Sequence, residues 1–545
     1  MLQTLRLPIC ICSRNYHKSE HTVPIPDYSL TDYLFRNISK FGKGIALVDY
    51  LTNRSITFDQ LYEEVDNVAN NLYALGLRTD DCVCLYGTNV PEFAHVVCSV
   101  TSNGASLTIA NSQLTAVELA HQLKATNSKF IFTTSECTER ARTAAQIYHK
   151  LQEIIVLGNQ TGFRPFSNLT ERPRIRRQES HIDPKKHTAL LPFSSGTTGL
   201  PKGVELTHYN LVAELSALSH RLFLPFDPKS EKSLSVLPMV HIAGLVIGML
   251  NPLSQGASVV TLPRFDPQTF LEAMEKHRIT FCLIAPPLVS FLAKHPLVAK
   301  YDLSSFHTPY SGAAALGKEL TMQMVERLKL TGIRQGYGMT ESSPATHTTP
   351  LNGYKYGSIG IPLPNTESKI VHIENGTTLG PNEPGEIWVR GPQVMKGYFD
   401  NAEATRTTLT DDGWLKTGDI GYYDNDSDYY VVDRLKEIIK YKGYQVAPAY
   451  LEGILLSHPS VGDVAVIGIP HGAAGDVPRA YVVRKSHVSG EELSAYVESQ
   501  VAPYKRLRGG VVFVSELPRS ASGKLLRNRL REEFLDKDSR EISQS

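Results

Sequence analysis

Hydroxyl residues, glycines and a lysine gather in one short stretch of this sequence, residues 191–204. The stretch reads Leu-Pro-Phe-Ser-Ser-Gly-Thr-Thr-Gly-Leu-Pro-Lys-Gly-Val. Small residues let a backbone turn sharply and approach a ligand closely, and glycine tolerates the positive φ that such turns need. Backbone N–H groups, hydroxyls and a lysine charge together suit an anion. The stretch therefore predicts a phosphate cradle made of Ser194, Ser195, Gly196, Thr197, Thr198, Gly199 and Lys202.

This cradle differs from the ordinary nucleotide P-loop. That pattern requires Gly-x-x-x-x-Gly-Lys-Ser/Thr, and neither Gly196 nor Gly199 fits it together with Lys202. Taken alone, a surface loop rich in Ser, Thr and Gly is the alternative interpretation.

Two later glycine-bounded stretches contain carboxylates that could bind a nucleotide. Glu341 lies in residues 336–342, and an oxygen ligand such as a carboxylate is what a hard cation prefers. Asp419 lies in residues 413–422, which look like a turn, and a carboxylate there can accept hydrogen bonds from both ribose hydroxyls. Each stretch taken alone is also compatible with an ordinary turn.

Lysines near the C-terminus are a third kind of candidate. Lys440 and Lys442 share one face if residues 438–444 form a strand, because side chains alternate along a strand. Lys524 lies in a turn of small residues ahead of a predicted helix. Lysines at such positions are ordinarily solvated, so their position alone assigns no role.

The elements that must position these residues alternate between short apolar strands and amphipathic helices. This alternation predicts an α/β fold with largely parallel sheets. The predicted strands cover residues 46–50, 83–86, 130–133, 154–157, 235–237, 258–261 and 281–285. The predicted helices include residues 91–105, 116–125, 270–277 and 287–295, with earlier helical periods between 29 and 77.

The pattern changes near residue 432, where short alternations predict a compact α+β unit of about a hundred residues. We therefore divide the chain into residues 1–22, a large domain over 23–433 and a small domain over 434–545. The large domain is expected to contain stacked sheets with helices. The charged residues 171–186 are predicted to be a surface connection leading to the cradle.

Length and composition limit the function classes. A chain of 545 residues is too long for one hydrophobic core. A formal net charge of +1 gives no electrostatic case for a nucleic acid or an acidic membrane partner. Seven cysteines without Cys-x-x-Cys spacing favour a reducing compartment over a disulfide scaffold. No apolar run reaches about 18 residues, so no membrane span is expected.

The N-terminus has a composition of its own. Residues 1–19 contain arginines and lysine but no acidic residue, which is typical of a mitochondrial transit peptide. A disordered tail without a targeting role is the alternative. The chain ends Ile-Ser-Gln-Ser and not Ser-Lys-Leu, so the expected location is mitochondrial or cytoplasmic.

The order Ser-Ser-Gly-Thr-Thr-Gly-Leu-Pro-Lys-Gly at residues 194–203 resembles the AMP-binding signature of the adenylate-forming ligases. That superfamily includes acyl-CoA synthetases, 4-coumarate–CoA ligase and beetle luciferase. Other stretches resemble the superfamily's further motifs in the same order. They are residues 311–320, 336–342, 413–422, 432–456 and 518–527. The resemblance therefore covers most of the chain.

The resemblance implies roles for particular residues. Tyr337 would stack on adenine, Thr340 would contact the α-phosphate and Glu341 would bind magnesium. Asp419 and Arg434 would hold the ribose. The remaining nucleotide contacts would come from Gly312, Ala313, Gly336 and Gly338, and Ser311 would line the acyl pocket. At Ala315 this chain departs from the proline common in 4-coumarate–CoA ligases, which affects the stiffness of that loop.

The resemblance also implies a small C-terminal domain that moves between two steps. Lys524 would be the adenylation lysine and Lys436 the hinge position. The thioester-forming loop would be Lys442, Gly443, Tyr444 and Gln445. A rotation that exchanges Lys524 for Lys442 would let one site serve both steps.

Residues 238–248 resemble the acyl-binding wall, with His241 at its entrance. 4-Coumarate–CoA ligases commonly have a tyrosine two positions after this histidine, where this chain has Ala243. The apolar residues that follow favour an aliphatic or plain aryl-alkyl acid. His241 could equally be a packed core histidine.

The resemblance thus implies an ATP-dependent carboxylic acid–CoA ligase that uses magnesium and proceeds through an acyl-adenylate. Its partners would be a small carboxylic acid, ATP and CoA, and its oligomeric state stays open. A 4-coumarate–CoA ligase-type activity and a luciferase-like adenylating mono-oxygenase are the alternatives. A carrier-loading enzyme would be followed by a carrier segment, and none follows Lys524 in this sequence.

Overall fold

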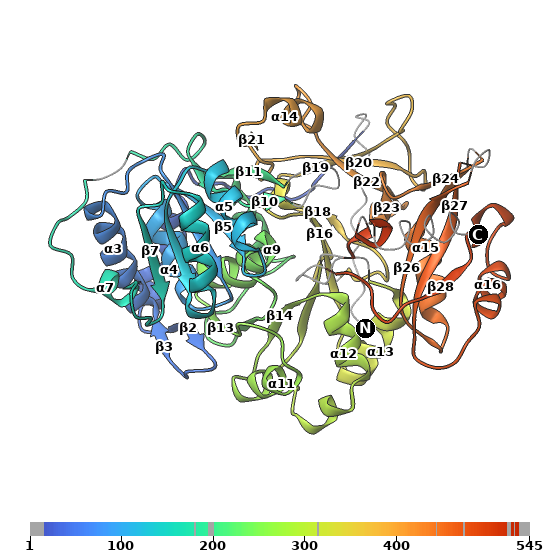
Figure 1. The fold of residues 1–545 in the computed structure, drawn as a ribbon, viewed down its shortest axis with the longest axis horizontal. Coiled ribbons are helices and arrows are strands. Elements are labelled where there is room, and N and C mark those ends of the chain that lie inside the picture. Colours follow the sequence, from blue (N-terminus) through green and yellow to red (C-terminus); the bar gives the residue numbers. More distant parts are fainter. Residues whose placement is uncertain are drawn as a thin grey trace.

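The computed structural model describes residues 16–178, 181–194, 201–312, 316–351, 353–442, 444–471, 475–519, 525–527 and 529–532. Its elements form a mixed α/β molecule with a large N-terminal part and a small C-terminal part (Figure 1). Among the described residues, no helix has the length and apolar character needed to cross a membrane.

The first sheet holds the strands on both sides of the predicted cradle. Its central strands are parallel, and the strands at the cradle end pair antiparallel. Strand β4 is buried along its whole length, as expected for a strand covered on both faces. In spatial order the strands are β10 (Phe193–Ser194), β11 (Lys202–Thr207), β9 (Thr188–Leu190), β5 (Ser106–Asn111), β4 (Cys82–Gly87), β6 (Ser128–Thr134), β7 (Glu153–Leu157) and β8 (Arg164–Pro165), and β21 (Gly397–Tyr398) pairs with β11.

The second sheet carries residues 336–342, which resemble a motif of the adenylate-forming ligases and are called the adenylate motif below. Its middle is parallel, while β17 and β18 at one edge and β3 at the other pair antiparallel. In spatial order the strands are β18 (Ile361–Pro362), β17 (Ala345–Thr348), β16 (Arg334–Gly338), β15 (Thr308–Ser311), β14 (Phe281–Ile284), β12 (Lys232–Ser235), β13 (Ser258–Thr261), β2 (Ile45–Asp49) and β3 (Ser55–Thr57).

A third sheet is antiparallel throughout, which corrects the expectation of largely parallel sheets for this part of the chain. The strands follow one another with few helices between them, so strand–helix alternation gave no signal for it. In spatial order they are β1 (His17–Lys18), β19 (Glu367–Val371), β20 (Gly385–Arg390), β22 (Leu415–Tyr423) and β23 (Tyr429–Arg434).

Helices of the large part cover the sheets, and several of them begin at polar capping residues. Thr57 and Gln60 form a capping box at the start of α3, and Thr115 and Glu118 form another at α5, which satisfies free backbone N–H groups. The α-helices are α1 (Leu30–Phe35), α2 (Ile38–Phe41), α3 (Phe58–Ala74), α4 (Glu92–Thr101), α5 (Ala116–Ala125), α6 (Thr138–Ile147), α7 (Ser167–Thr170), α8 (His208–Leu218), α9 (Ile242–Leu245), α10 (Asn251–Ser254), α11 (Pro267–Lys276), α12 (Pro286–Lys294), α13 (Lys318–Leu328) and α14 (Ala402–Thr408). Shorter turns are η1 (Ser135–Cys137), the π-helical η2 (Val246–Leu250), η3 (Pro296–Lys300) and η4 (Thr340–Ser342).

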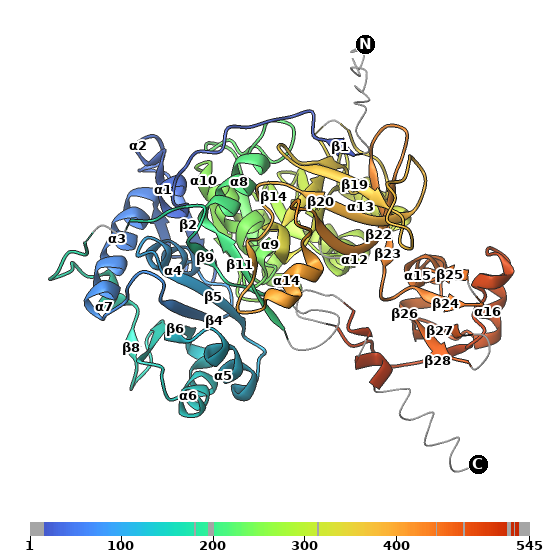
Figure 2. The ribbon, with the colours of Figure 1, turned by 90° about the horizontal axis from the view of Figure 1, so that it is seen from above.

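The C-terminal elements form a lobe with its own hydrophobic core, which includes Ile439, Leu451, Val466 and Leu493. Figure 2 shows this lobe beside the three sheets, joined to them after β23. Its elements are β24 (Ile439–Tyr441), β25 (Tyr444–Val446), α15 (Pro448–Ser457), β26 (Val461–Pro470), β27 (Asp476–Arg484), α16 (Gly490–Glu498), η6 (Pro503–Lys505) and β28 (Val511–Phe513). The predicted α/β fold with a small α+β C-terminal domain is confirmed.

Residues 16–22 pack onto the large part. The alternative of a disordered tail up to residue 22 is therefore wrong for these seven residues. Strand β1 pairs with β19 through His17 and Lys18. Ser19 Oγ donates a hydrogen bond to the Pro362 carbonyl oxygen at 3.1 Å, and Ser19 is buried. Residues 1–15 lie outside the described part of the chain.

Candidate functional site

Strands β10 and β11 hold the two ends of the predicted cradle. They pair antiparallel, with Ser194 opposite Lys202 and Phe193 opposite Gly203. The two described ends of the cradle are therefore neighbours in one sheet. Ser194 and Lys202 are both partly buried. Ser195, Gly196, Thr197, Thr198 and Gly199 lie outside the described residues.

The motif of residues 336–342 lies next to this hairpin, because both β10 and β11 contact η4. Its glycines are required by close contacts. A Cβ at Gly336 would lie 2.0 Å from the Tyr310 hydroxyl, and one at Gly338 would lie 1.9 Å from the Pro344 carbonyl oxygen. Thr340, the first residue of η4, is partly exposed, and Glu341 is buried.

Tyr398 joins the two motifs. Its hydroxyl donates a hydrogen bond to Glu341 Oε1 at 2.8 Å, and Lys202 Nζ lies 5.1 Å from the centre of its ring. Burial and the nearby Glu341 carboxylate raise the pKa of Tyr398, so the phenol remains a donor at neutral pH. Sequence reasoning missed this residue, because nothing in its type or spacing connects it with Glu341, which is 57 positions away.

A second cluster brings together Tyr337, predicted to stack on adenine, and Asp419 and Arg434, predicted to hold the ribose. The Tyr337 hydroxyl donates to Asp419 Oδ2 at 2.8 Å, and Arg434 Nε lies 3.2 Å from Asp419 Oδ1. Burial and the Asp419 charge raise the pKa of Tyr337 well above its ordinary value. Asp419 lies within strand β22, opposite Arg434 on β23, and not in a turn as its flanking glycines suggested.

Ser311, predicted to line the acyl pocket, and Gly312, predicted to contact the nucleotide, lie against the same motif. Ser311, which is buried, ends strand β15, and β15 pairs with β16. A Cβ at Gly312 would lie 3.6 Å from the Gly336 carbonyl oxygen, so the two backbones are close neighbours. Ala313 lies outside the described residues.

The predicted acyl wall is a short helix, α9, followed directly by the π-helical turn η2. His241 is the residue before this helix and is partly buried. Its backbone N–H donates to the Pro238 carbonyl oxygen at 3.1 Å. Ala243 is partly buried and packs against the main hydrophobic core. The neighbouring side chains are apolar and buried in that core: Ile242, Leu245, Val246 and Ile247.

Glu214 is a buried carboxyl group that sequence reasoning missed. It lies on helix α8, which contacts η2, and it is 0% exposed. Glu214 Oε1 accepts a hydrogen bond from the Ala345 N–H at 2.9 Å. Burial raises the pKa of Glu214 well above its ordinary value. A glutamate in a helical pattern is ordinarily a surface residue, so nothing in the sequence indicated that Glu214 is buried.

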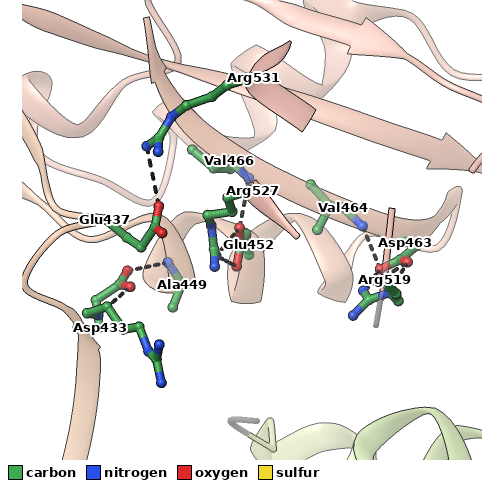
Figure 3. Close-up of polar contacts among 11 residues, drawn as sticks. Asp433, Glu437, Ala449, Glu452, Asp463, Val464, Val466, Arg519, Arg527 and Arg531 are labelled. Carbon is green, nitrogen blue, oxygen red and sulfur yellow. Dashed lines mark hydrogen bonds and ion pairs between the residues drawn. The ribbon is translucent and has the colours of Figure 1, made fainter. Parts of the chain in front are cut away.

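Carboxylate contacts surround the predicted hinge (Figure 3). Lys436 is exposed in the turn that follows β23. On one side of it, Asp433 accepts a hydrogen bond from the Ala449 N–H at 2.8 Å. On the other side, Glu437 and Arg531 form an ion pair at 3.3 Å. The hinge is thus flanked by contacts to the C-terminal lobe.

The predicted thioester loop is a hairpin, so the prediction of a single strand over residues 438–444 is wrong. Strands β24 and β25 pair antiparallel, and Lys442 stands in the turn with a φ of 47°. The alternation argument for a shared face of Lys440 and Lys442 therefore does not apply, although both are exposed. Tyr444 is 55% exposed and stacks on Tyr504 with ring centres 4.6 Å apart. Gly443 and the side chain of Gln445 lie outside the described part.

Lys524 also lies outside the described residues, but the chain on each side of it is anchored (Figure 3). Arg519 binds both oxygens of Asp463, with Arg519 Nη2 at 2.7 and 2.9 Å. Arg527 Nη2 binds both oxygens of Glu452 at 2.7 and 2.8 Å. Arg519 and Leu525 form an isolated β-bridge, so the two ends of the segment lie together.

Two family profiles match the chain. The profile of the AMP-binding enzyme matches residues 34–399, and that of the AMP-binding enzyme C-terminal domain matches residues 450–524. The first match alone spans more than half of the chain.

The chain is similar to several CoA ligases. The chain is 36% identical to "Probable 4-coumarate--CoA ligase 1" of Dictyostelium discoideum, with 96% of this chain and 98% of that protein covered. It is 38% identical to "Peroxisomal OPC-8:0-CoA ligase 1" of Arabidopsis thaliana, with 96% and 97% covered. The crystal structure of the anthranilate CoA ligase AuaEII in complex with anthranoyl-AMP aligns with a TM-score of 0.86 at 27% identity, covering 95% of this chain and 99% of that chain. From these matches we conclude that the chain belongs to the adenylate-forming, AMP-binding enzymes and is an ATP-dependent acid–CoA ligase.

Proposed function

We propose that this ligase activates an apolar acid, either a medium- or long-chain fatty acid or an aryl-alkanoate. A carboxylate is a poor acyl donor, because its charge and resonance disfavour attack by a nucleophile. In the first step the carboxylate attacks the α-phosphorus of ATP and pyrophosphate leaves. In the second step the CoA thiolate attacks the acyl-adenylate, and AMP leaves as the thioester forms.

The cradle residues and the adenylate motif would stabilise the first step. Negative charge grows on the phosphate oxygens during attack, so fixed cations and N–H donors lower the barrier. Lys202 and Thr340 supply a charge and a hydroxyl beside the β10–β11 hairpin. We assign Lys524 the same role on the α-phosphate, from the resemblance of residues 518–527 to the adenylation motif.

Glu341 is our candidate for the magnesium ligand, and its surroundings fit a hard cation. It is a carboxylate in the turn η4, next to the Thr340 hydroxyl. Among the described residues, no group of three or more His, Cys, Asp or Glu side chains could hold a metal by itself. Magnesium commonly binds through one or two carboxylates together with substrate phosphates, so a single glutamate is adequate. When bound, the cation would neutralise phosphate charge.

The Tyr337–Asp419–Arg434 cluster supports the assignment of the nucleoside pocket. Each Asp419 oxygen already has a protein partner, Tyr337 on one and Arg434 on the other. A carboxylate has about four acceptor positions, so ribose hydroxyls can still donate to it. We assign Tyr337 to the adenine ring, beside Gly336, Gly338 and Gly312.

The second step would follow a rotation of residues 434–545 about Lys436. Lys442, Gly443, Tyr444 and Gln445 would then replace the Lys524 segment at the acyl-adenylate. The exposure of Lys442 in the turn of the β24–β25 hairpin supports this proposal. The exposure of Lys436 supports it too, because a hinge residue must be able to change its backbone angles without disturbing a core.

One observation carries the choice of an apolar acid, namely the buried aliphatic residues on both sides of Ala243. Relatives are named for 4-coumarate and for OPC-8:0, so a 4-coumarate-type activity is the second candidate. The test is a panel of octanoate, longer fatty acids, 3-phenylpropanoate and 4-coumarate with ATP, Mg²⁺ and CoA, read by pyrophosphate release. A preference for 4-coumarate would overturn our choice of acid. Light emission with luciferin would instead reveal a luciferase-like activity.

For location we propose mitochondria, with the cytoplasm as the alternative. The support is the basic, acid-free composition of residues 1–19. Residues 1–25 fused to a fluorescent protein should reach mitochondria, and a diffuse signal would favour the cytoplasm. Because residues 16–22 pack on the fold, cleavage is expected before Tyr16.

A further inference from the structure

The segment 391–399 holds the two phosphate-binding motifs together, although its sequence suggested no role. Met395 N–H donates to the Glu341 carbonyl oxygen at 2.9 Å, and Phe399 N–H donates to the Gly203 carbonyl oxygen at 2.8 Å. Strand β21 pairs with β11 directly after the cradle, with Tyr398 opposite Val204 (Figure 1). This segment therefore fixes η4 against the β10–β11 hairpin through main-chain contacts.

Within the segment, the side chain of Tyr398 contacts two candidate ATP-site residues, Glu341 and Lys202. Its N–H donates to Thr405 Oγ1 at 2.9 Å, which ties the residue to helix α14. Its side chain is largely buried, and its hydroxyl donates to Glu341 Oε1 at 2.8 Å. A carboxylate has two oxygens, so a hydrogen bond at Oε1 fixes the plane of the group and directs Oε2.

The ring of Tyr398 has a second contact. Lys202 Nζ lies 5.1 Å from the ring centre, within the range of a cation–π interaction. Lysine is a flexible side chain, so a contact of this kind restricts the positions of its charge. One tyrosine thus contacts both the carboxylate and the lysine that face the ATP phosphates in the proposed function.

We propose that Tyr398 is a positioning residue of the ATP site, whose hydroxyl orients the Glu341 carboxylate for the cation and whose ring restrains Lys202. This inference rests on the proposed role of Glu341 as the magnesium ligand. Tyr398 itself contacts no reacting atom in the proposal, and it acts through its two neighbours.

The test is binding of ATP to the full-length chain, measured by isothermal titration calorimetry without acid or CoA. Each variant is titrated in EDTA and at a series of Mg²⁺ concentrations. Tyr398→Phe keeps the ring, so affinity in EDTA should stay unchanged while the strengthening by Mg²⁺ falls about tenfold, as expected for loss of a hydrogen bond to a charged group. Tyr398→Leu also removes the ring, so it should weaken ATP binding severalfold even in EDTA.

Two controls make the result specific. Tyr86→Phe removes another tyrosine hydroxyl, which donates to the Ser112 and Leu114 carbonyl oxygens in the first sheet, and should change neither titration. Glu341→Gln should lose the Mg²⁺ dependence, and adding Tyr398→Phe to it should cause no further loss. Such non-additivity is what action through Glu341 requires.

The outcomes separate this inference from the proposed function. If Glu341→Gln loses the Mg²⁺ dependence and Tyr398→Phe does not, the inference is overturned and Glu341 keeps its role. If neither variant changes it, the magnesium assignment of Glu341 is wrong and the inference is overturned with it. Equal effects of Tyr398→Phe and Tyr398→Leu would overturn the role of the ring.

Discussion

Glu214 places an ionisable carboxyl group inside the hydrophobic core of the large part. One oxygen accepts the Ala345 N–H, and the residue is 0% exposed. Burial raises the pKa of the neighbouring Tyr310 to about 12, and an ionised Glu214 would raise it further. Since a buried charge without a counter-charge is costly, Glu214 should be protonated in the folded protein at neutral pH.

Glu214→Gln should therefore change how stability depends on pH. Burial raises the folded-state pKa of Glu214 above its unfolded value, so its contribution is fully present below about pH 4.5 and is lost as pH rises toward the folded pKa. In that window the wild type should lose up to about 1.4 kcal/mol per pH unit from this group. Gln keeps an acceptor for Ala345 and has no proton to lose, so its advantage should grow from pH 5 to pH 7.

Urea unfolding of both proteins at several pH values measures this difference. Glu319→Gln is the matched control, because Glu319 is exposed on helix α13. Parallel pH profiles for the Glu214→Gln variant and the wild type would show that Glu214 is ionised in the fold.

Ala243→Tyr should shift the choice of acid. The wild type should disfavour 3-(4-hydroxyphenyl)propanoate against 3-phenylpropanoate by about 5- to 150-fold in kcat/KM, because burying an unpaired hydroxyl costs about 1–3 kcal/mol. The Ala243→Tyr variant should reduce the ratio of kcat/KM for 3-phenylpropanoate to kcat/KM for 3-(4-hydroxyphenyl)propanoate. If the new side chain fills the pocket, turnover of both substrates should be blocked. Ala243→Val adds bulk without a hydroxyl and should leave the ratio unchanged. An unaltered ratio in the tyrosine variant would place the acid elsewhere.

At the scale of elements, the C-terminal lobe contains two short segments with candidate lysines, and different elements of the lobe hold them in place. Lys442 stands in the turn of the β24–β25 hairpin. The segment with Lys524 is anchored by Arg519 to Asp463 and by Arg527 to Glu452. Because the two segments are held by different elements, a rotation of the lobe could bring one lysine to the site at a time.

Lys524→Ala should impair acyl-adenylate formation by around 10²–10³, the usual cost of one electrostatic contact to a transition state. Given synthetic acyl-adenylate, the same variant should still form acyl-CoA. Lys442→Ala should do the opposite, with one release of pyrophosphate followed by a stall. Pyrophosphate bursts and thioester formation are measured separately. Equal damage to both steps by both variants would exclude the rotating-domain mechanism.

At the scale of the whole molecule, the N-terminal strand joins distant parts of the chain. His17 Nδ1 lies 3.1 Å from the Tyr429 hydroxyl, 412 positions away. Ser19 N–H donates to the Thr366 carbonyl oxygen at 2.9 Å. Residues 16–22 therefore close the edge of the antiparallel sheet that carries Asp419 and Arg434.

Removal of residues 1–15 should leave stability unchanged, whereas removal of residues 1–22 should lower it by about 1–3 kcal/mol for each buried polar group left unpaired. The groups concerned are the Tyr429 hydroxyl and the carbonyl oxygens of Thr366 and Pro362. Thermal unfolding of both truncated proteins measures the effect. Equal melting temperatures would show that the strand is dispensable.

The sequence alone determined the enzyme family and the class of the fold. Glycines, hydroxyls and carboxylates at fixed spacing identify motifs because each motif is one continuous segment whose function depends on its own backbone. Hydrophobic periodicity likewise predicted helix α5 and strand β13 with their observed bounds, because burial of one face is a local pattern.

Only the tertiary structure decided which side chains support that chemistry. Tyr398 meets Glu341 across 57 positions, and Glu214 meets Ala345 across 131 positions. The turn at Lys442 and the antiparallel sheet around Asp419 also depend on strand partners. Such contacts form when separate segments pack together, so no periodicity or spacing within one segment records them.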